Sequence, residues 1–222
     1  MALPMAPRFD HLEQFIPRAR MLELSATVIG LGAVGRQLAL QLVALGIPKL
    51  QLIDFAKVEL ADVTSQGFLS EDVGSFKADA VGGLSHRAEP RLDLETICDR
   101  FQSSHVVGTS VFCCVGDDAG RVTIWEAVRN RCRFWGDGRI VADTARILVA
   151  AEESQRRHYG QTLTLPDEAI RKPKSVPFPY TGTLAAALLV HQFVRYLQGR
   201  PLVADASFDL ATGKYLVTDE RN

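Results

Sequence analysis

The sequence lacks the paired cysteines of a zinc site and any excess of charge of one sign. Its four cysteines, Cys98, Cys113, Cys114 and Cys132, include no C-x-x-C pair, so no zinc is expected. They suggest buried thiols in a reducing, cytoplasmic setting. With 25 Lys and Arg against 26 Asp and Glu, the net charge of −1 argues against a general affinity for nucleic acid or an anionic membrane.

Long hydrophobic runs are also missing. The longest one near the C-terminus, residues 184–190, is too short to cross a bilayer. The first residues contain no basic segment followed by an apolar core, so we expect no signal peptide. There is no internal repeat or low-complexity tract, and 222 residues suit one domain over 1–222. These absences favour a globular cytoplasmic protein without a membrane partner.

The most informative stretch present is Val28-Ile29-Gly30-Leu31-Gly32-Ala33-Val34-Gly35, which has the form G-x-G-x-x-G. An amphipathic run to Leu45 follows it, and a second apolar run then ends on Asp54. This order of strand, glycine turn, helix, strand and acid is typical of a nucleotide-binding unit. Gly30 would permit the tight turn, Gly32 the approach of a phosphate, and Gly35 close packing of the helix on the strand.

The same pattern has more than one explanation. The N–H groups at the start of the helix would attract an anion, and Asp54 would accept from a ribose hydroxyl. NAD would satisfy these contacts as well as ATP. Packing alone would also select glycines in a strand–helix–strand unit, and that alternative stays open.

Hydrophobic periodicity predicts an α/β fold, a Rossmann-like three-layer sandwich with a mainly parallel sheet and a C-terminal antiparallel extension. Further strands are predicted at residues 92–96, 110–115, 133–135 and 140–142, and a C-terminal hairpin at 206–210 and 215–218. Further helices are predicted from Ser70 or Ser75 to Glu89, from Thr181 or Thr183 to Leu197, and over 119–131 with Val122, Trp125, Ala127 and Val128 on the inner face.

Two segments are expected to lie outside this pattern, a helical lead-in over residues 1–24 and a crossing loop over 150–178. The loop carries basic runs at 155–158 and 171–174, which are either solvated or positioned to cover a site or meet an acidic partner. His191 is expected to be a core histidine with a local hydrogen bond, and Phe134-Trp135 could face a partner.

A set of features follows the glycine stretch: the segment 46–54, Val58-Glu59, Gln66, Lys77 and the segment 179–187. Together with the glycine stretch they resemble the ThiF/MoeB/HesA family of adenylyltransferases, which is related to ubiquitin-activating enzymes. The resemblance extends from about Arg8 to Gly199.

The resemblance implies binding of ATP and Mg²⁺ and adenylylation of the C-terminal carboxylate of a small ubiquitin-like or sulfur-carrier protein. Lys77 would contact phosphate and Asp117 or Asp118 would hold magnesium, which makes these three the candidate catalytic residues. Capping of the next helix is a compatible alternative for the two aspartates. The residues expected to bind the nucleotide are Gly30, Leu31, Gly32, Ala33, Val34, Gly35, Asp54, Phe55, Asp62, Gln66 and Lys77.

The chain departs from the family pattern at charged positions. Asp62 stands where the family has Asn, Ser65 where it has Arg, and His11 near the place of an N-terminal Arg. Removing one cationic donor from a transition state typically costs on the order of 10²–10³ in rate. The candidates to replace the missing charges are Arg121, Arg139 and Arg146.

A cysteine is missing as well. Family members that form a thioester or persulfide carry one in the crossing loop, and this chain has none after Cys132, so we predict no covalent thioester step. The preferred function is an adenylyltransferase, as a homodimer or a heterodimer with a related subunit. The alternatives are a catalytically degenerate nucleotide-binding subunit of a larger complex and an NAD-dependent oxidoreductase, for which the chain is short.

Overall fold

A computed structural model describes residues 12, 13, 15–164 and 178–218. The described residues contain an eight-stranded sheet in the order β3-β2-β1-β4-β5-β6-β7-β8. Neighbouring strands from β3 to β5 are parallel, and those from β5 to β8 are antiparallel. This confirms the predicted α/β class and the antiparallel C-terminal extension. The strands are β1 (Ser25–Ile29), β2 (Lys49–Ile53), β3 (Asp93–Ile97), β4 (Ser110–Cys113), β5 (Phe134–Val141), β6 (Thr144–Ala150), β7 (Asp205–Asp209) and β8 (Lys214–Val217).

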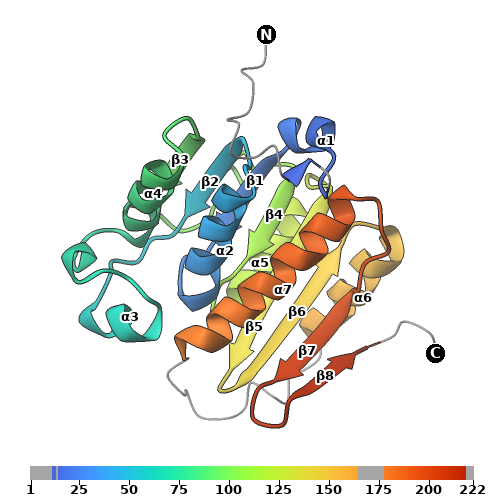
Figure 1. Ribbon diagram of the computed structural model, residues 1–222. Coiled ribbons are helices and arrows are strands. Elements are labelled where there is room, and N and C mark those ends of the chain that lie inside the picture. Colours follow the sequence, from blue (N-terminus) through green and yellow to red (C-terminus); the bar gives the residue numbers. More distant parts are fainter. Residues whose placement is uncertain (1–11, 14, 165–177, 219–222) are drawn as a thin grey trace.

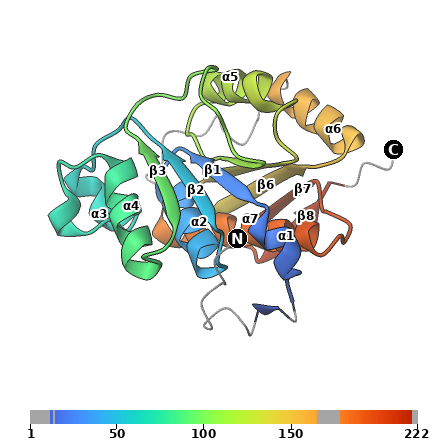
Figure 2. The same cartoon turned by 90° about the horizontal axis from the view of Figure 1, so that it is seen from above.

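Helices cover both faces of the sheet (Figures 1 and 2). One face carries α2 (Ala33–Ala44), α4 (Lys77–Ala88) and α7 (Pro179–Leu197), and the other carries α5 (Asp118–Val128) and α6 (Glu153–Thr164). The shorter elements are α1 (Arg18–Leu22), α3 (Leu60–Ser65) and the 3₁₀ turn η2 (Ser70–Asp72). No described helix is both long and apolar enough to cross a membrane.

Each helical layer packs on its own apolar core. On the α2/α7 side, Phe112 and Phe134 from the sheet meet Phe193 of α7, with ring centroids 5.2–5.6 Å apart. On the α5/α6 side, Trp125 and Tyr159 have ring centroids 4.7 Å apart and pack on the strands. Burying one such side chain contributes about 1.5–3 kcal/mol, so these contacts hold both layers firmly on the sheet.

The structure corrects several predicted boundaries. The strands expected at 133–135 and 140–142 are one strand, β5, because Gly136 and Gly138 keep the extended backbone and admit Phe112 and Leu189 against it. The predicted crossing loop contains helix α6, and its residues 165–177 lie outside the described part of the chain. Neither predicted serine caps α4, which follows Phe76, and α7 begins at Pro179 rather than at a threonine.

Four predicted side-chain environments are also wrong. Phe134 and Trp135 are fully buried, so they do not face a partner. His191, expected in the core, is exposed on α7, because that helix buries one face rather than its whole circumference. Val122 is exposed on α5, where Arg121 and Ile124 are buried instead.

Candidate functional site

A cavity of about 730 Å³ lies at the carboxyl ends of the parallel strands. Strand β1 pairs with β2 on one side and with β4 on the other, and such a switch in strand order opens a crevice in α/β sheets. The walls come from the turns after β1, β2, β3 and β4 and from the second half of β5. The charged residues that line it are Lys77, Arg100, Arg121, Arg139, Asp54, Asp99 and Asp117.

The glycine turn forms one wall of the cavity. The physical reason for a glycine is not the same at each of its three positions. Gly30 has φ +86°, and a Cβ there would lie 2.8 Å from the Cys114 carbonyl. A Cβ on Gly35 would clash with the Gly30 carbonyl oxygen, so packing alone explains both glycines. Gly32 differs, because a Cβ there would only touch Gln66 Oε1 at 3.6 Å and would otherwise fill cavity space. Packing therefore leaves Gly32 unexplained, whereas a phosphate close to the backbone would require it.

Asp54, predicted to hold a ribose, follows β2 and braces the glycine turn. Its Oδ2 accepts the Leu31 N–H at 2.6 Å, and its Oδ1 accepts the Ala56 N–H at 2.8 Å. An ionised carboxylate has about four acceptor positions, so both oxygens can accept further hydrogen bonds from a ligand. Asp54 lines the cavity, and this position fits the predicted role.

Lys77 and Gln66 line one end of the cavity, whereas Asp62, also predicted to bind the nucleotide, contacts Lys77 but is not among the lining residues. Lys77 begins α4, and its backbone N–H donates to Ala56 O at 2.9 Å, which docks the helix beside β2. Its Nζ lies 3.0 Å from Asp62 Oδ2 and donates to Gln66 Oε1 at 2.9 Å. Asp62 also accepts the Glu59 N–H at 2.9 Å, which completes a capping box at the start of α3. The Lys77 charge is thus neutralised by a neighbouring carboxylate.

The two candidate magnesium ligands differ in position. Asp117 lines the cavity, and its Oδ1 accepts the Gly120 N–H at 2.7 Å, so it caps α5. Asp118 is 60% exposed, pairs with Arg121 at 2.9 Å, and is not among the residues that line the cavity. Within the described ranges no three His, Cys, Asp or Glu side chains cluster as a metal site. Mg²⁺ held by phosphates needs only one or two protein carboxylates, which Asp117 fits better.

Beside the cavity lies a charged cluster that joins two of the predicted arginines to Asp137, a residue that was not predicted. Asp137 on β5 is fully buried and accepts from Arg121 Nε at 3.1 Å, Arg139 Nε at 2.8 Å and Tyr159 OH at 3.0 Å. Burial lowers the pKa of both guanidiniums, but the Asp137 charge outweighs it and leaves both pKa values raised. Arg121 also pairs with Asp118 at 2.9 Å, so the two guanidiniums beside the cavity are held by two carboxylates. The sequence signal was the acid within Gly136-Asp137-Gly138 of an apolar segment.

Of the three arginines expected to replace missing charges, two line this cavity. Arg146 instead pairs with Asp205 through Nε at 3.0 Å and Nη2 at 2.8 Å, away from the site. Arg100, which was not predicted, lies with Cζ 3.7 Å from the ring centroid of Phe55, a predicted nucleotide contact. His11 lies outside the described residues.

All four thiols have raised pKa values, in each case chiefly because of burial. For Cys113 the pKa rises to about 12. Cys114 lines the cavity, yet burial and the nearby Cys113 and Asp137 raise its pKa well above the usual value. A thiolate nucleophile needs a lowered pKa, so none of these thiols has the environment of a reactive cysteine.

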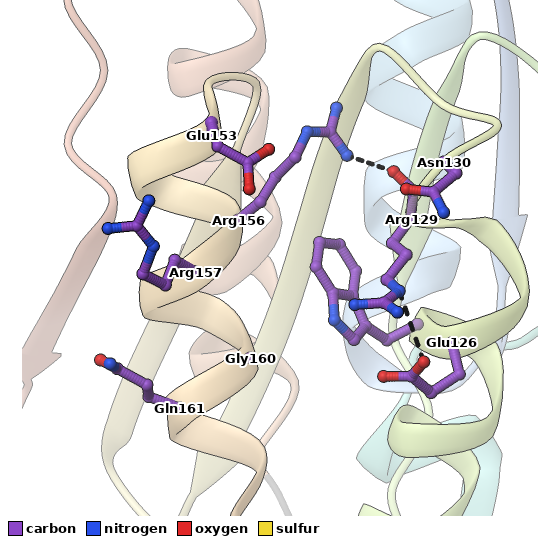
Figure 3. Close-up of a pocket in the computed structure, with 9 residues that line it drawn as sticks. Glu126, Arg129, Asn130, Glu153, Arg156, Arg157, Gly160 and Gln161 are labelled. Carbon is purple, nitrogen blue, oxygen red and sulfur yellow. Dashed lines mark hydrogen bonds and ion pairs between the residues drawn. The ribbon is translucent and has the colours of Figure 1, made fainter.

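A second cavity of about 400 Å³ lies between α5 and α6 (Figure 3). Arg156, from the predicted basic run 155–158, donates to Arg129 O at 2.6 Å and to Cys132 O at 2.9 Å. Arg129 pairs with Glu126 at 3.4 Å. Arg156 therefore ties α6 to the end of α5, which is a structural role that neither interpretation of the basic run included. The second basic run, 171–174, lies outside the described residues.

Known proteins share both the sequence pattern and the fold. The ThiF family pattern matches residues 10–114. Ubiquitin-like modifier-activating enzyme 5 of Branchiostoma floridae is 27% identical over 133 residues, which cover 52% of this chain and 33% of that protein. DNA damage tolerance protein RHC31 of Saccharomyces cerevisiae is 36% identical over 78 residues, which cover 35% of this chain and 22% of that protein. The chain spans a third or less of the length of these relatives.

Among solved structures, E. coli MccB with ATP superimposes with a TM-score of 0.73. The match covers 96% of this chain and 71% of that chain, at 15% sequence identity. At this identity the likeness concerns the fold.

Proposed function

We propose that this chain, whose residues 10–114 match the ThiF family, is a member of that family and that it binds ATP and adenylylates a carboxylate of a small partner protein. The observation that carries the proposal is the open space over Gly32 at the N-terminus of α2. Backbone N–H groups at such an end bind phosphate. Lys77 lies at the same cavity, where it would contact the phosphates.

The proposed reaction is the transfer of AMP to a carboxylate. A carboxylate oxygen attacks the α-phosphorus of ATP, the bond to the bridging oxygen breaks, and pyrophosphate leaves with the electron pair. Stabilising the developing negative charge is the main catalytic need. Lys77, Arg121 and Arg139, which all line the cavity, are the cations placed to supply it. Asp117 would hold Mg²⁺, which would neutralise further phosphate charge.

The proposed acceptor is the C-terminal carboxylate of a ubiquitin-like or sulfur-carrier protein. Support comes from the curated relatives named as activating ubiquitin-like modifiers. We further propose that the residues of this chain form no thioester, since burial raises the pKa of each thiol and residues 133–222 contain no cysteine. A homodimer or a heterodimer with a related subunit, in the cytoplasm, remains part of the proposal.

Exchange of labelled pyrophosphate into ATP, measured with candidate carrier proteins, tests the proposal. We expect exchange that depends on a free carrier C-terminus and is absent with a C-terminal amide. Lys77→Gln should lower the rate on the order of 10²–10³, whereas Asp93→Asn, at an exposed pair with Lys49, should leave it unchanged. Absence of exchange with every carrier that binds the protein would overturn the proposal.

A second candidate function is a nucleotide-binding subunit without catalysis. The observation that favours it is the contact of Asp62 with Lys77, because the carboxylate opposes phosphate binding at that end of the cavity. Calorimetric titration with Mg-ATP separates the two: tight binding without exchange supports this candidate, and exchange excludes it. Titration with NADH tests the third candidate, an NAD-dependent oxidoreductase. Binding of NADH at micromolar concentration would favour it.

A further inference from the structure

Tyr159 joins helix α6 to the buried carboxylate of Asp137. It is fully buried, and Gln155, four residues before it, is also buried. Residues four apart lie on one face of a helix, so this pair marks the face that α6 turns toward the sheet. The Tyr159 ring packs against Trp125 and Trp135, with ring centroids 4.7 and 5.3 Å away. These aromatic contacts fix the ring and hold its hydroxyl at Asp137.

One carboxylate oxygen of Asp137 receives two donors. Its Oδ2 accepts the Tyr159 hydroxyl at 3.0 Å and Arg139 Nε at 2.8 Å, whereas its Oδ1 accepts Arg121 Nε at 3.1 Å. Burial and the nearby Asp137 charge raise the pKa of Tyr159 well above its usual value, so the phenol stays protonated and donates. A donor to a buried carboxylate stabilises the negative charge there. Tyr159 therefore shares with Arg139 the oxygen that holds this arginine.

Arg139 connects the buried carboxylate to the cavity. It lines the cavity together with its neighbours Gly138 and Ile140, whereas Asp137 is fully buried and is not among the lining residues. Residues two apart in a strand point to the same face of the sheet, so β5 places the Asp137 carboxylate beside the Arg139 guanidinium. An anion in the cavity therefore competes with Asp137 for the charge of Arg139.

We propose that Tyr159 is a positioning residue: its hydroxyl weakens the hold of Asp137 on Arg139 and so keeps the Arg139 charge available to the phosphates of a bound nucleotide. The inference deepens the proposed function, on which it rests, because Arg139 is one of the cations proposed there to stabilise phosphate charge. Without the hydroxyl, Arg139 would be the remaining donor to Oδ2 within the described part of the chain. Helix α6 thus contributes to anion binding without contacting the ligand.

Two titrations test the role of the hydroxyl, a calorimetric one with ATP and an NMR one with adenosine. Tyr159→Phe keeps the ring between Trp125 and Trp135 and removes the donor. We expect it to weaken ATP about three- to tenfold, which corresponds to one hydrogen bond. Adenosine has no phosphate, so its affinity should stay unchanged. A merely structural role of the hydroxyl would weaken both ligands.

Tyr196→Phe is the matched control. Tyr196 lies on α7, which covers the opposite face of the sheet from α6 (Figure 2). Its ring centroid lies 5.1 Å from that of Phe134, and its hydroxyl forms no hydrogen bond with a described residue. The variant loses the same atom from a packed phenol ring. It should therefore bind both ATP and adenosine as the wild type does.

A double-mutant cycle shows whether the hydroxyl acts through Arg139. In an Arg139→Met background, Tyr159→Phe should change the affinity for ATP by less than about twofold. Equal effects of Tyr159→Phe in the two backgrounds would overturn the positioning role, and so would a Tyr159→Phe protein that does not fold. If Arg139→Met does not fold, the ratio of ATP to adenosine affinity in Tyr159→Phe alone decides.

The failures of the two proposals are distinguishable. A wild-type ratio of ATP to adenosine affinity in Tyr159→Phe, with pyrophosphate exchange intact, overturns the positioning role and leaves the adenylyltransferase. An affinity for ATP that depends on the Tyr159 hydroxyl, without any exchange, supports the positioning role and overturns the adenylyltransferase. Absence of ATP binding by the wild type overturns both.

Discussion

Replacing Asp62 by Asn should increase the affinity for Mg-ATP while lowering the stability of the ligand-free protein. Asp62 and Lys77 are side chains with 11% and 10% exposure, and their charged atoms lie 3.0 Å apart. An Asn side chain can still accept the Glu59 N–H that caps α3. The substitution therefore removes the negative charge and leaves the local backbone contacts in place.

The two effects have different magnitudes. A unit charge about 8 Å from a phosphate, at an effective dielectric constant of about 20, contributes about 2 kcal/mol, and salt reduces this. The expected gain in affinity is thus roughly 5- to 30-fold. Lys77 keeps only Gln66 Oε1 at 2.9 Å, and partial loss of partners for a buried donor costs about 1–3 kcal/mol.

Calorimetric titration and thermal unfolding of the same preparations measure both effects. Saturating Mg-ATP should raise the melting temperature of Asp62→Asn by more than that of the wild type, because tighter binding stabilises the folded state further. Asp93→Asn, at an exposed ion pair, controls for the loss of one negative charge. Equal or weaker binding of Mg-ATP by Asp62→Asn would refute the claim that Asp62 opposes the phosphates.

Three further outcomes follow from the buried charges and thiols. Asp137→Asn removes the buried carboxylate that Arg121 and Arg139 share, which should cost about 3–5 kcal/mol and lower the melting temperature by about 6–20 °C. A fall in melting temperature no larger than that of Asp93→Asn would contradict this role of Asp137. Burial raises the pKa of Asp205, but Arg146 and His158 outweigh it, so the net pKa is lowered. Its stabilisation is complete above the unfolded value of about 3.9 and is lost as pH falls through the lower folded value, so Asp205→Asn should flatten the fall in unfolding free energy below about pH 4. Because burial raises the pKa of all four thiols, an aromatic disulfide reagent at pH 8 should react slowly with the native protein and quickly after unfolding. A thiol that reacts quickly in the native protein would contradict the proposed absence of a thioester step.

Much of the nucleotide-binding unit could be predicted because its signals are local. The glycine turn from Gly30 to Gly35 and the acid after β2 lie within one strand–helix–strand segment. The alternation of strands and helices follows from side-chain periodicity over a few residues. The buried runs of β1, β2 and β4 identify the parallel centre of the sheet.

Helix α6 was not predicted, and strand β5 was predicted only as two separate strands, for a physical reason. Helix α6 is polar and charged, and among its described residues only Gln155 and Tyr159 are buried. Strand β5 contains Gly136 and Gly138, which by propensity weaken a strand. In the structure these glycines admit side chains from a neighbouring strand and helix, and such contacts depend on residues distant in the sequence.

The sequence by itself determined the class of fold, the glycine turn and the identity of the charged residues near it. Only the tertiary structure decided which charges meet. Asp62 is brought against Lys77, Asp137 against two arginines, and Asp118 against one of these arginines rather than into the lining of the cavity. These pairings depend on how α3, α4 and β5 pack around the sheet, and electrostatic interactions depend on distance and burial rather than on residue type. For the same reason, the turn at Gly30–Gly35 indicates where a nucleotide would bind, and the surrounding charges determine what can happen to it there.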